Sequence, residues 1–271
     1  MIVRWILAAA FLFLGTGNLL SQPAETEHVL VPVLPATVRG AFGSEWVTTL
    51  AVANVSPTPA LVFPYGGSGP CTVIICGQPN AIPPAASIVI RSMLPSSEVT
   101  GGFLDIPRGR ASDLAFTLRV LDTSRGFETW GVVIPIVRFD ALFAKRFDLG
   151  DIPVGGHFRT LLRLYDVTAA TKGSVRVRVY QVNPSQGDPW GAPYQPDVLL
   201  TDFTPSFATP ISGGGAANYP GYFELSLESL PEVVRAQRVR VEIEPLDGRQ
   251  DYWGFVSVTD NNTQHVTVIT P

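Results

Sequence analysis

The chain reads Gly43-Ser44-Glu45-Trp46-Val47-Thr48-Thr49-Leu50-Ala51-Val52-Ala53-Asn54-Val55 in its first half and Gly155-Gly156-His157-Phe158-Arg159-Thr160-Leu161-Leu162-Arg163-Leu164-Tyr165-Asp166-Val167 in its second. The two segments align without a gap, with Trp46 opposite Phe158. Apolar and polar residues alternate in them, which is typical of a β-strand with one buried face. A strand sequence that recurs in this way predicts tandem copies of one β domain.

A second echo follows the first in the same order. Phe116–Val120 leads to Trp130-Gly131, and Val239–Ile243 leads to Trp253-Gly254. On this alignment Trp46 and Trp130 are 84 positions apart, whereas Phe158 and Trp253 are 95 apart. The second copy is therefore predicted to hold an insertion of 11 residues, placed in the segment 183–222, which is rich in Pro, Gly and aromatic residues.

Composition and periodicity favour an all-β chain. Gly and Pro number 25 and 24, charged residues are only 15% of the chain, and long helix-favouring stretches are missing. In Ser174–Tyr180 three valines alternate with two arginines, as in an antiparallel strand with one wet face. Expected strands are 29–33, 46–52, 88–90, 114–121 and 130–137 in the first copy, and 158–165, 174–182, 223–227, 238–243, 253–258 and 264–269 in the second.

These strands predict two tandem antiparallel β-sandwich domains of the immunoglobulin or fibronectin kind. The first is expected over 28–140 and the second over 150–271, with the long loop 183–222 inside it. Loosely alternating apolar residues in 138–154 predict a strand or a half-packed linker that holds the domains in a fixed relation. Within the long loop, Val198-Leu199-Leu200 is a further candidate for a short strand.

The N-terminus has the layout of a secretory signal peptide. Arg4 precedes an apolar run, Trp5 to Leu14, that is too short to span a bilayer comfortably. We expect a signal peptide over 1–22 and an extracytoplasmic mature chain without a transmembrane segment. In such an oxidising compartment Cys71 and Cys76 predict a local disulfide, because neither metal-binding nor redox spacing is present.

Several function classes find no support in the sequence. A net charge of −4 without a basic stripe argues against nucleic acid or an anionic membrane as partner. The glycine-rich segment around Ser68 has Pro70 where a nucleophile elbow needs its last glycine. The three histidines form no metal pair at helical spacing. No catalytic residue, metal site or cofactor is therefore assigned.

Carboxylates offer an enzymatic alternative. A carbohydrate-active hydrolase using groups such as Glu224 or Asp251 would need two carboxyl groups facing one cleft. Glu242 and Glu244 are expected to share the solvated face of one strand. The segment 260–263, Asp-Asn-Asn-Thr, is expected to form a turn between two strands, with calcium binding as the weaker interpretation.

Aromatic residues divide into two groups. Trp46, Trp130 and Trp253 lie inside apolar alternations and are expected to pack in cores, the last two as equivalent anchors of the two copies. Other aromatics lie in or beside the long Pro/Gly segment and can offer flat faces to a glycan or an envelope protein, or fold back as a lid over their own domain. The ligand-binding residues predicted on this basis are Trp190, Tyr194, Tyr219 and Tyr222.

The last strand pair, from Trp253-Gly254-Phe255-Val256 to Val266-Thr267-Val268-Ile269, resembles the ends of uncharacterised secreted bacterial proteins with repeated β-sandwich modules. The segment from Trp46 to Asn54 looks like their early strand. The resemblance implies an exported bacterial protein and assigns no catalytic residue.

The sequence thus favours a secreted, non-enzymatic binding, structural or adhesion-type protein whose recognition surface is the loop 183–222. The alternatives are a carbohydrate-active hydrolase or accessory glycan-binding module, and a subunit of a cell-surface assembly. The assembly hypothesis expects an exposed apolar patch or an unpaired edge strand such as 264–269.

Overall fold

The computed structural model describes residues 26–33, 37–40, 43–64, 80–90, 101–125, 131–167, 174–183, 195–208, 220–249 and 251–271. The predicted signal peptide, both cysteines and Trp130 lie outside these residues. The described chain is built of antiparallel strands joined by turns and short 3-10 segments. The all-β sandwich predicted from the sequence is confirmed.

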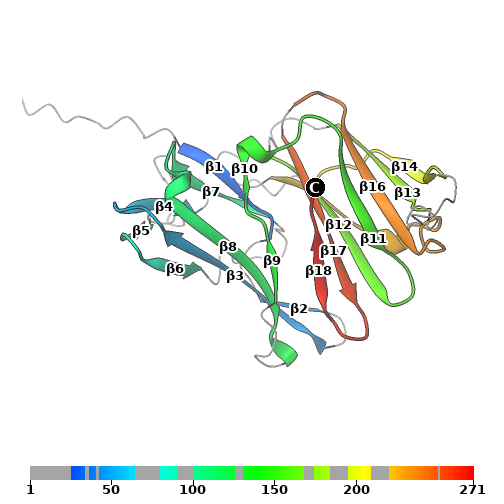
Figure 1. Cartoon of the computed structure of the whole chain (residues 1–271), viewed down its shortest axis with the longest axis horizontal. Coiled ribbons are helices and arrows are strands. Elements are labelled where there is room, and N and C mark those ends of the chain that lie inside the picture. The colour runs from blue at the N-terminus through cyan, green and yellow to red at the C-terminus, as the bar shows by residue number, and fades with distance from the viewer. Residues whose placement is uncertain are drawn as a thin grey trace, which may run out of the picture.

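The first half of the chain forms two sheets (Figure 1). One has the order β10-β1-β7-β4-β5, and the other has the order β2-β3-β8-β9 with β6 also paired to β3. The strands are β1 (Thr26–Val31), β2 (Thr37–Arg39), β3 (Glu45–Asn54), β4 (Ala60–Pro64), β5 (Asn80–Ile82), β6 (Ser87–Ile90), β7 (Gly102–Pro107), β8 (Leu114–Asp122), β9 (Val132–Ile134) and β10 (Val137–Arg138). The 3-10 segments are η2 (Ala111–Asp113), η3 (Thr123–Arg125) and η4 (Phe139–Ala141).

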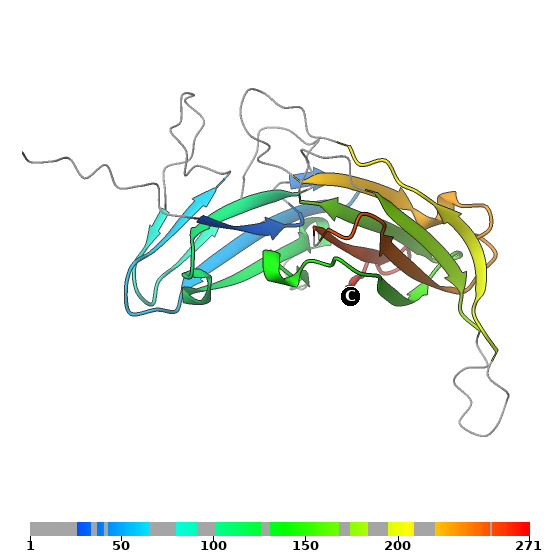
Figure 2. The same cartoon turned by 90° about the horizontal axis from the view of Figure 1, so that it is seen from above.

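The second half forms two sheets of four strands, β11-β16-β13-β14 and β15-β12-β17-β18. The strands are β11 (Phe147–Pro153), β12 (Phe158–Asp166), β13 (Val175–Gln181), β14 (Val198–Phe203), β15 (Gly221–Ser226), β16 (Arg238–Pro245), β17 (Tyr252–Asp260) and β18 (Val266–Ile269). One 3-10 segment, η6 (Leu227–Ser229), follows β15. The two halves lie end to end along the long axis of the molecule (Figure 2).

The two halves share one pairing scheme. The path β1-β7-β4-β5 is matched by β11-β16-β13-β14, and the pairs β6-β3, β3-β8 and β8-β9 are matched by β15-β12, β12-β17 and β17-β18. Trp46 lies opposite Asp122 in the first half, and Phe158 lies opposite Asp260 in the second. The first echo, Trp46 with Phe158, is therefore a true structural equivalence.

The second predicted equivalence, between Phe116–Val120 and Val239–Ile243, is displaced by one strand. It matches β8 to β16, whereas β8 pairs with β3 as β17 pairs with β12. The equivalent segments end at Asp122 and Asp260, each of which accepts a hydrogen bond at Oδ1 from the amide two residues later, at 3.0 and 2.7 Å. The distances from Trp46 to Asp122 and from Phe158 to Asp260 are 76 and 102 positions, so the second half is longer by 26 residues and not by 11.

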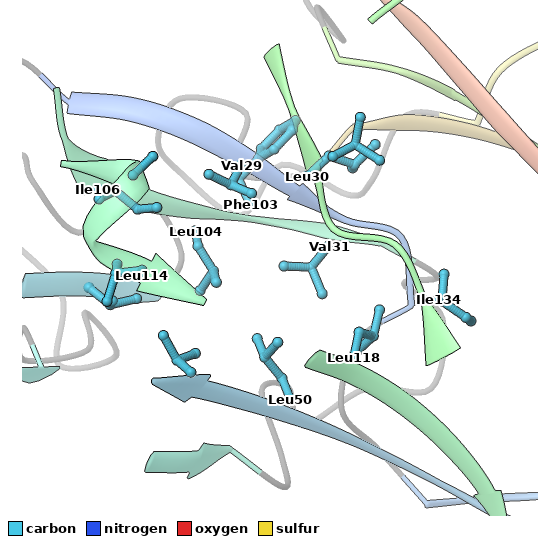
Figure 3. Packing of buried hydrophobic residues seen from close by; sticks show 14 of the residues in the cluster. Val29, Leu30, Val31, Leu50, Phe103, Leu104, Ile106, Leu114, Leu118 and Ile134 are labelled. Atoms are coloured by element: carbon cyan, nitrogen blue, oxygen red, sulfur yellow. The ribbon is translucent and has the colours of Figure 1, made fainter. Parts of the chain in front are cut away.

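The core of the first half lies between its two sheets (Figure 3). Val29, Val31 and Leu104 extend from one sheet, and Leu50 and Leu118 from the other, all with no exposed surface. On β3 the burial follows the period-two alternation of a strand, because every second side chain points inward. Burying each such side chain is worth about 1.5–3 kcal/mol.

The core of the second half follows the same rule. Val175, Val177 and Val179 of β13 are at most 1% exposed, while the arginines between them face outward. The alternation predicted for this strand is confirmed. On the facing sheet, Leu162 and Val256 close the core.

The segment between the halves contacts both cores. Leu142 belongs to the first core, Phe147 and Leu149 belong to the second, and Phe143 packs against both. The rings of Phe143 and Phe147 stack with centroids 4.6 Å apart. β11 and the half-packed residues before it therefore agree with the strand or half-packed linker expected over 138–154.

A second connection joins the outer face of β12 and β17 to the first core. Tyr165, Trp253 and Phe255 all belong to the first core cluster, although they come from the second half. The Tyr165 ring is fully buried, its hydroxyl donates to the carbonyl oxygen of Pro32, and its Cε1 atom lies 2.8 Å from where a Cβ on Gly101 would stand. Only glycine at position 101 leaves room for this ring. β17 is thus covered on both faces where it carries these aromatics.

Candidate functional site

A cleft of about 430 Å³ lies where the two halves meet. On one side it is lined by the continuation of the first half's inner face, with Val33, Val38, Trp46, Thr48, Val120, Val132 and Ile134. On the other side it is lined by Arg159, Thr160, Leu161, Arg163, Ser226, Phe255, Ser257, Thr259, Val266 and Val268. The strands that carry these residues, β3, β8 and β9 on one side and β12, β17 and β18 on the other, face each other across the joint (Figure 1). The volume falls within the range of about 300–1,000 Å³ that small-molecule sites occupy.

Strand register explains why the cleft has these walls. Thr48 pairs with Val120, and Val120 pairs with Val132, so these side chains form one row across three strands. In the second half Leu161 pairs with Ser257 and Arg163 with Phe255. Since alternate residues share a face, the row from Arg159 to Tyr165 points away from the second core. The part of this face near Tyr165 is buried in the joint, and the rest lines the cleft.

Two arginines are the charged groups among the lining residues. Arg159 donates from Nη2 to Oε1 of Gln264 at 2.8 Å, and Arg163 donates from Nε to Oε2 of Glu224 at 2.8 Å. The guanidinium carbon of Arg163 also lies 5.8 Å from the centroid of the Phe255 ring, a cation–π distance. Both side chains are therefore held in place by partners at the edge of the cleft.

Gln264 holds Arg159 from a strained position. Its side chain is buried and donates from Nε2 to the carbonyl oxygen of Asn261 at 2.7 Å. Its backbone has a φ of 57°, a left-handed conformation that residues other than glycine adopt at a cost of about 1–3 kcal/mol. The turn that leads to this residue is fixed by Asp260, whose pKa is lowered by hydrogen bonds from the backbone amides of Thr263 and Asn262. The turn predicted over 260–263 is confirmed, and it orients the Arg159 support.

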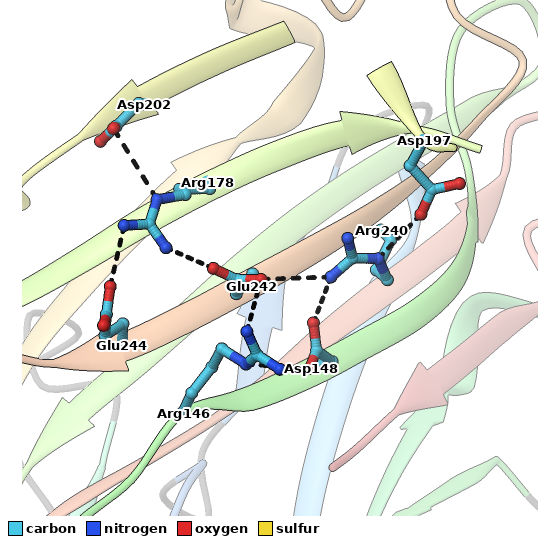
Figure 4. A network of polar contacts seen from close by, with 8 residues as sticks. All are labelled: Arg146, Asp148, Arg178, Asp197, Asp202, Arg240, Glu242 and Glu244. Carbon is cyan, nitrogen blue, oxygen red and sulfur yellow. Dashed lines mark hydrogen bonds and ion pairs between the residues drawn. The ribbon is translucent and has the colours of Figure 1, made fainter. Parts of the chain in front are cut away.

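The outer face of the β11-β16-β13-β14 sheet carries a dense ion-pair network (Figure 4). Glu242 lies at its centre, with its side chain only 6% exposed, and pairs with Arg178 at 2.5 Å, Arg240 at 3.5 Å and Arg146 at 3.6 Å. Glu244 pairs with Arg178 at 2.9 Å. The expectation of a solvated face was wrong for Glu242, because Arg178 of β13, Arg146 just before β11 and Arg240 of its own strand enclose it. Breaking such a buried network at one member is costly, since it leaves a charge without compensation.

A smaller polar cluster closes the loop between β16 and β17. The Tyr252 hydroxyl donates to Oδ2 of Asp247 at 2.5 Å and accepts from Arg249 at 2.9 Å and from the Ser174 amide at 3.1 Å. Partial burial would raise the pKa of Asp247, but hydrogen bonds from Tyr252 and Arg249 lower it to about 2. Burial and the hydrogen bond to Asp247 raise the pKa of Tyr252 to about 12. The cluster keeps a carboxylate ionised and a phenol neutral, as a structural contact requires.

The carboxylates proposed for hydrolysis have arginine partners. Glu224 pairs with Arg163 at 2.8 Å, and Asp251 pairs with Arg249 at 3.3 Å. A glycosidase needs one carboxyl group whose pKa is raised so that it can act as an acid. The pKa values of Asp247 and Asp260 are both lowered, which does not suit such an acid.

His28 and Asp105 form a further pair, on the outer face of the β1-β7 ladder. Asp105 is 1% exposed and contacts Nδ1 of His28, while the rings of Phe103 and Phe139 pack beside the imidazole at 5.9 and 5.5 Å. The hydrogen bond to Asp105 raises the pKa of His28, and burial opposes this rise. The pair joins neighbouring strands at register partners and lies apart from the cleft lining.

The structure places one of the four predicted ligand-binding aromatics. Tyr222 lies in β15 opposite Tyr165, half-buried against the first core. Trp190, Tyr194 and Tyr219 lie outside the described residues, so their role stays a prediction. Sequence reasoning missed the cleft arginines because Arg159 and Arg163 have the spacing of an ordinary polar strand face.

The tryptophans that were predicted to lie in cores occupy two different environments. Trp253 is 5% exposed and packs between the halves, as expected of a core residue. Trp46 is half-buried and lines the cleft. In the pairing scheme Trp253 is equivalent to Ala115 of β8, so its predicted equivalence with Trp130 is wrong.

Comparisons with known proteins name no relative for this chain. No family model matches it, and a search of curated proteins finds no match. Among solved structures, the crystal structure of the infectious bursal disease virus VP2 subviral particle is similar at 9% identity, over 91% of this chain and 71% of that chain, with a TM-score of 0.23. A likeness this weak carries no argument about fold or function.

Among the described residues, no helix is both long enough and apolar enough to cross a membrane. Within the same residues, no group of three or more His, Cys, Asp or Glu side chains is arranged to hold a metal ion.

Proposed function

We propose that this chain is an extracytoplasmic, non-enzymatic binding protein that holds a small ligand in the cleft between its two halves. The single observation that carries the proposal is the cleft itself, about 430 Å³ with mostly apolar walls. Ligand sites are concave and largely apolar, contain a few placed polar groups, and occur preferentially where domains meet. The cleft has all four features if the halves are the two tandem domains that the sequence predicts.

The packing of the joint supports the same function. Tyr165, Trp253 and Phe255 fix one wall to the other half, and Phe143 fixes the linker to both cores. A preformed site loses less entropy when a ligand binds than a site that must first assemble. The arginine partners of Glu224 and Asp251 favour binding over the hydrolase alternative, because these carboxylates already serve in ion pairs.

The test uses Nile red, a neutral apolar dye whose fluorescence rises in an apolar site. Val132 lines the cleft, while its neighbour Val133 is 49% exposed and points to the other face of β9. We expect the wild-type chain to bind the dye, Val132→Phe to weaken binding at least fivefold by filling the cleft, and Val133→Phe to bind as the wild type does. Equal binding by both variants would show that the dye lies elsewhere and would refute the proposal, as would an absence of dye binding.

A further inference from the structure

The charge distribution of the cleft points to one class of ligand. Ten of its lining residues are apolar, five carry hydroxyl groups and two are arginines. No carboxylate occurs among the lining residues that the structure describes. The cleft thus combines apolar walls with two guanidinium groups, of which that of Arg163 is paired with Glu224 outside the lining. This combination selects against neutral and cationic ligands more than against anionic ones.

The arginines occupy one wall in a fixed geometry. Arg159 and Arg163 lie on the same face of β12, four positions apart, with Leu161 between them. A guanidinium has five N–H donors in a planar fork, so one edge can hold a protein acceptor while another meets a ligand oxygen. Gln264 and Glu224 are those protein acceptors here. Their contacts hold the two positive groups beside the cleft before any ligand arrives.

The apolar surface extends away from this wall. Phe255 and Val268 come from the second half, and Trp46, Val120 and Val132 face them from the first. A body of aliphatic or aromatic carbon would bury its surface here at about 25 cal/mol per Å². The hydroxyl groups of Ser257 and Thr259 lie on the arginine side of β17, because they pair with Leu161 and Arg159. They can donate additional hydrogen bonds to an oxyanion.

We propose that the ligand is a small amphiphile with one carboxylate, whose carboxylate meets the β12 wall that carries Arg159 and Arg163 and whose apolar body lies between Phe255 and the β8-β9 wall. This inference rests on the proposed function, since it names the ligand class of the same cleft.

The test compares decanoate with 1-decanol, two probes of one chain length that differ in charge at pH 7.5. Each displaces Nile red from the wild-type chain below the concentration at which it aggregates. We expect decanoate to bind at least tenfold more tightly than decanol. The double variant Arg159→Gln/Arg163→Gln should bind both probes with the affinity of wild type for decanol. Arg176→Gln is the matched control, since Arg176 is also a strand arginine paired with a carboxylate, on the far sheet, and it should leave both affinities unchanged.

The outcomes separate the two proposals. If decanol and decanoate displace the dye equally from the wild type, or if the double variant keeps its preference for decanoate, the ligand class is wrong while the binding cleft stands. If neither probe displaces the dye and Val132→Phe does not affect dye binding, the cleft is not a binding site and both proposals fall.

Discussion

The hydroxyl group of Tyr165 ties the second half of the chain to the first. Its ring has no exposed surface, and its oxygen donates a hydrogen bond to the carbonyl of Pro32, which follows β1. Tyr165→Phe removes this one oxygen atom and keeps the ring. Because the ring stays, no cavity forms, and the variant measures the hydrogen bond across the joint.

The expected cost follows from burial. A hydrogen bond contributes about 0.5–1.5 kcal/mol net, but a buried acceptor that loses its donor costs about 1–3 kcal/mol. Tyr165 is fully buried, so the free energy of unfolding should fall by about 2 kcal/mol. For a chain of this size such a loss lowers the Tm by roughly 4–8 °C.

Urea unfolding followed by tryptophan fluorescence measures this change, because Trp253 packs 6.2 Å from the Tyr165 ring, centroid to centroid. Tyr180→Phe is the control. Tyr180 lies half-buried on the outer face of β13 under the Arg240 guanidinium, 4.3 Å from its ring centroid, and its loss of a hydroxyl should cost less than about 0.5 kcal/mol. Equal stability losses in the two variants would mean that the joint does not depend on the Tyr165 hydrogen bond.

Two further predictions concern the polar cluster and the loop. The pKa of Asp247 is lowered to about 2, so its contribution to stability is complete above its ordinary pKa of 3.8 and is lost as the pH falls through 2. Asp247→Asn should therefore destabilise the chain by about 1 kcal/mol at pH 6, after allowance for solvent screening, and by almost nothing near pH 2; a pH-independent difference in urea unfolding would contradict this. The recognition role predicted for the loop 183–222 requires that Trp190→Ala/Tyr194→Ala abolish binding to polysaccharides or to an envelope preparation while the Tm stays unchanged, and binding that survives both changes would refute it.

β13, a strand with one wet face, could be predicted from the sequence by its alternation, and β7, a strand covered on both faces, could not. β13 was found because its valines and arginines alternate. β7, Gly102–Pro107, was missed although it pairs with β1 and β4 at the centre of its sheet. Five of its six residues are buried, so its sequence shows no alternation, and it begins with Gly and ends with Pro. Periodicity reports the contrast between two faces, and a strand without that contrast gives no signal.

The misplaced second echo has a physical cause as well. A Trp-Gly pair occurs in both halves, but glycine is required for a different structural reason at each position. Gly131 has a φ of +69°, whereas Gly254 lies within β17, where a Cβ would stand 2.5 Å from Cδ2 of Leu164. The repeated feature is the aspartate that ends β8 and β17, because in each case its carboxylate fixes the following turn. The aspartate at the end of the strand therefore marks the register more reliably than the tryptophan of the Trp-Gly pair.

The corrected register also shows where the two halves differ, and this difference creates the cleft. The positions of Tyr165 and Trp253 on the outer face of the second half are occupied in the first half by Ala53 and Ala115. Phe255 is likewise replaced by Thr117. Three large aromatics in one copy and small residues in the other mean that only the second half can bury this face against a neighbour. The cleft is therefore a property of the joint and not of the repeated scaffold, which is why the scaffold's pattern alone could reveal the sheets and not the site.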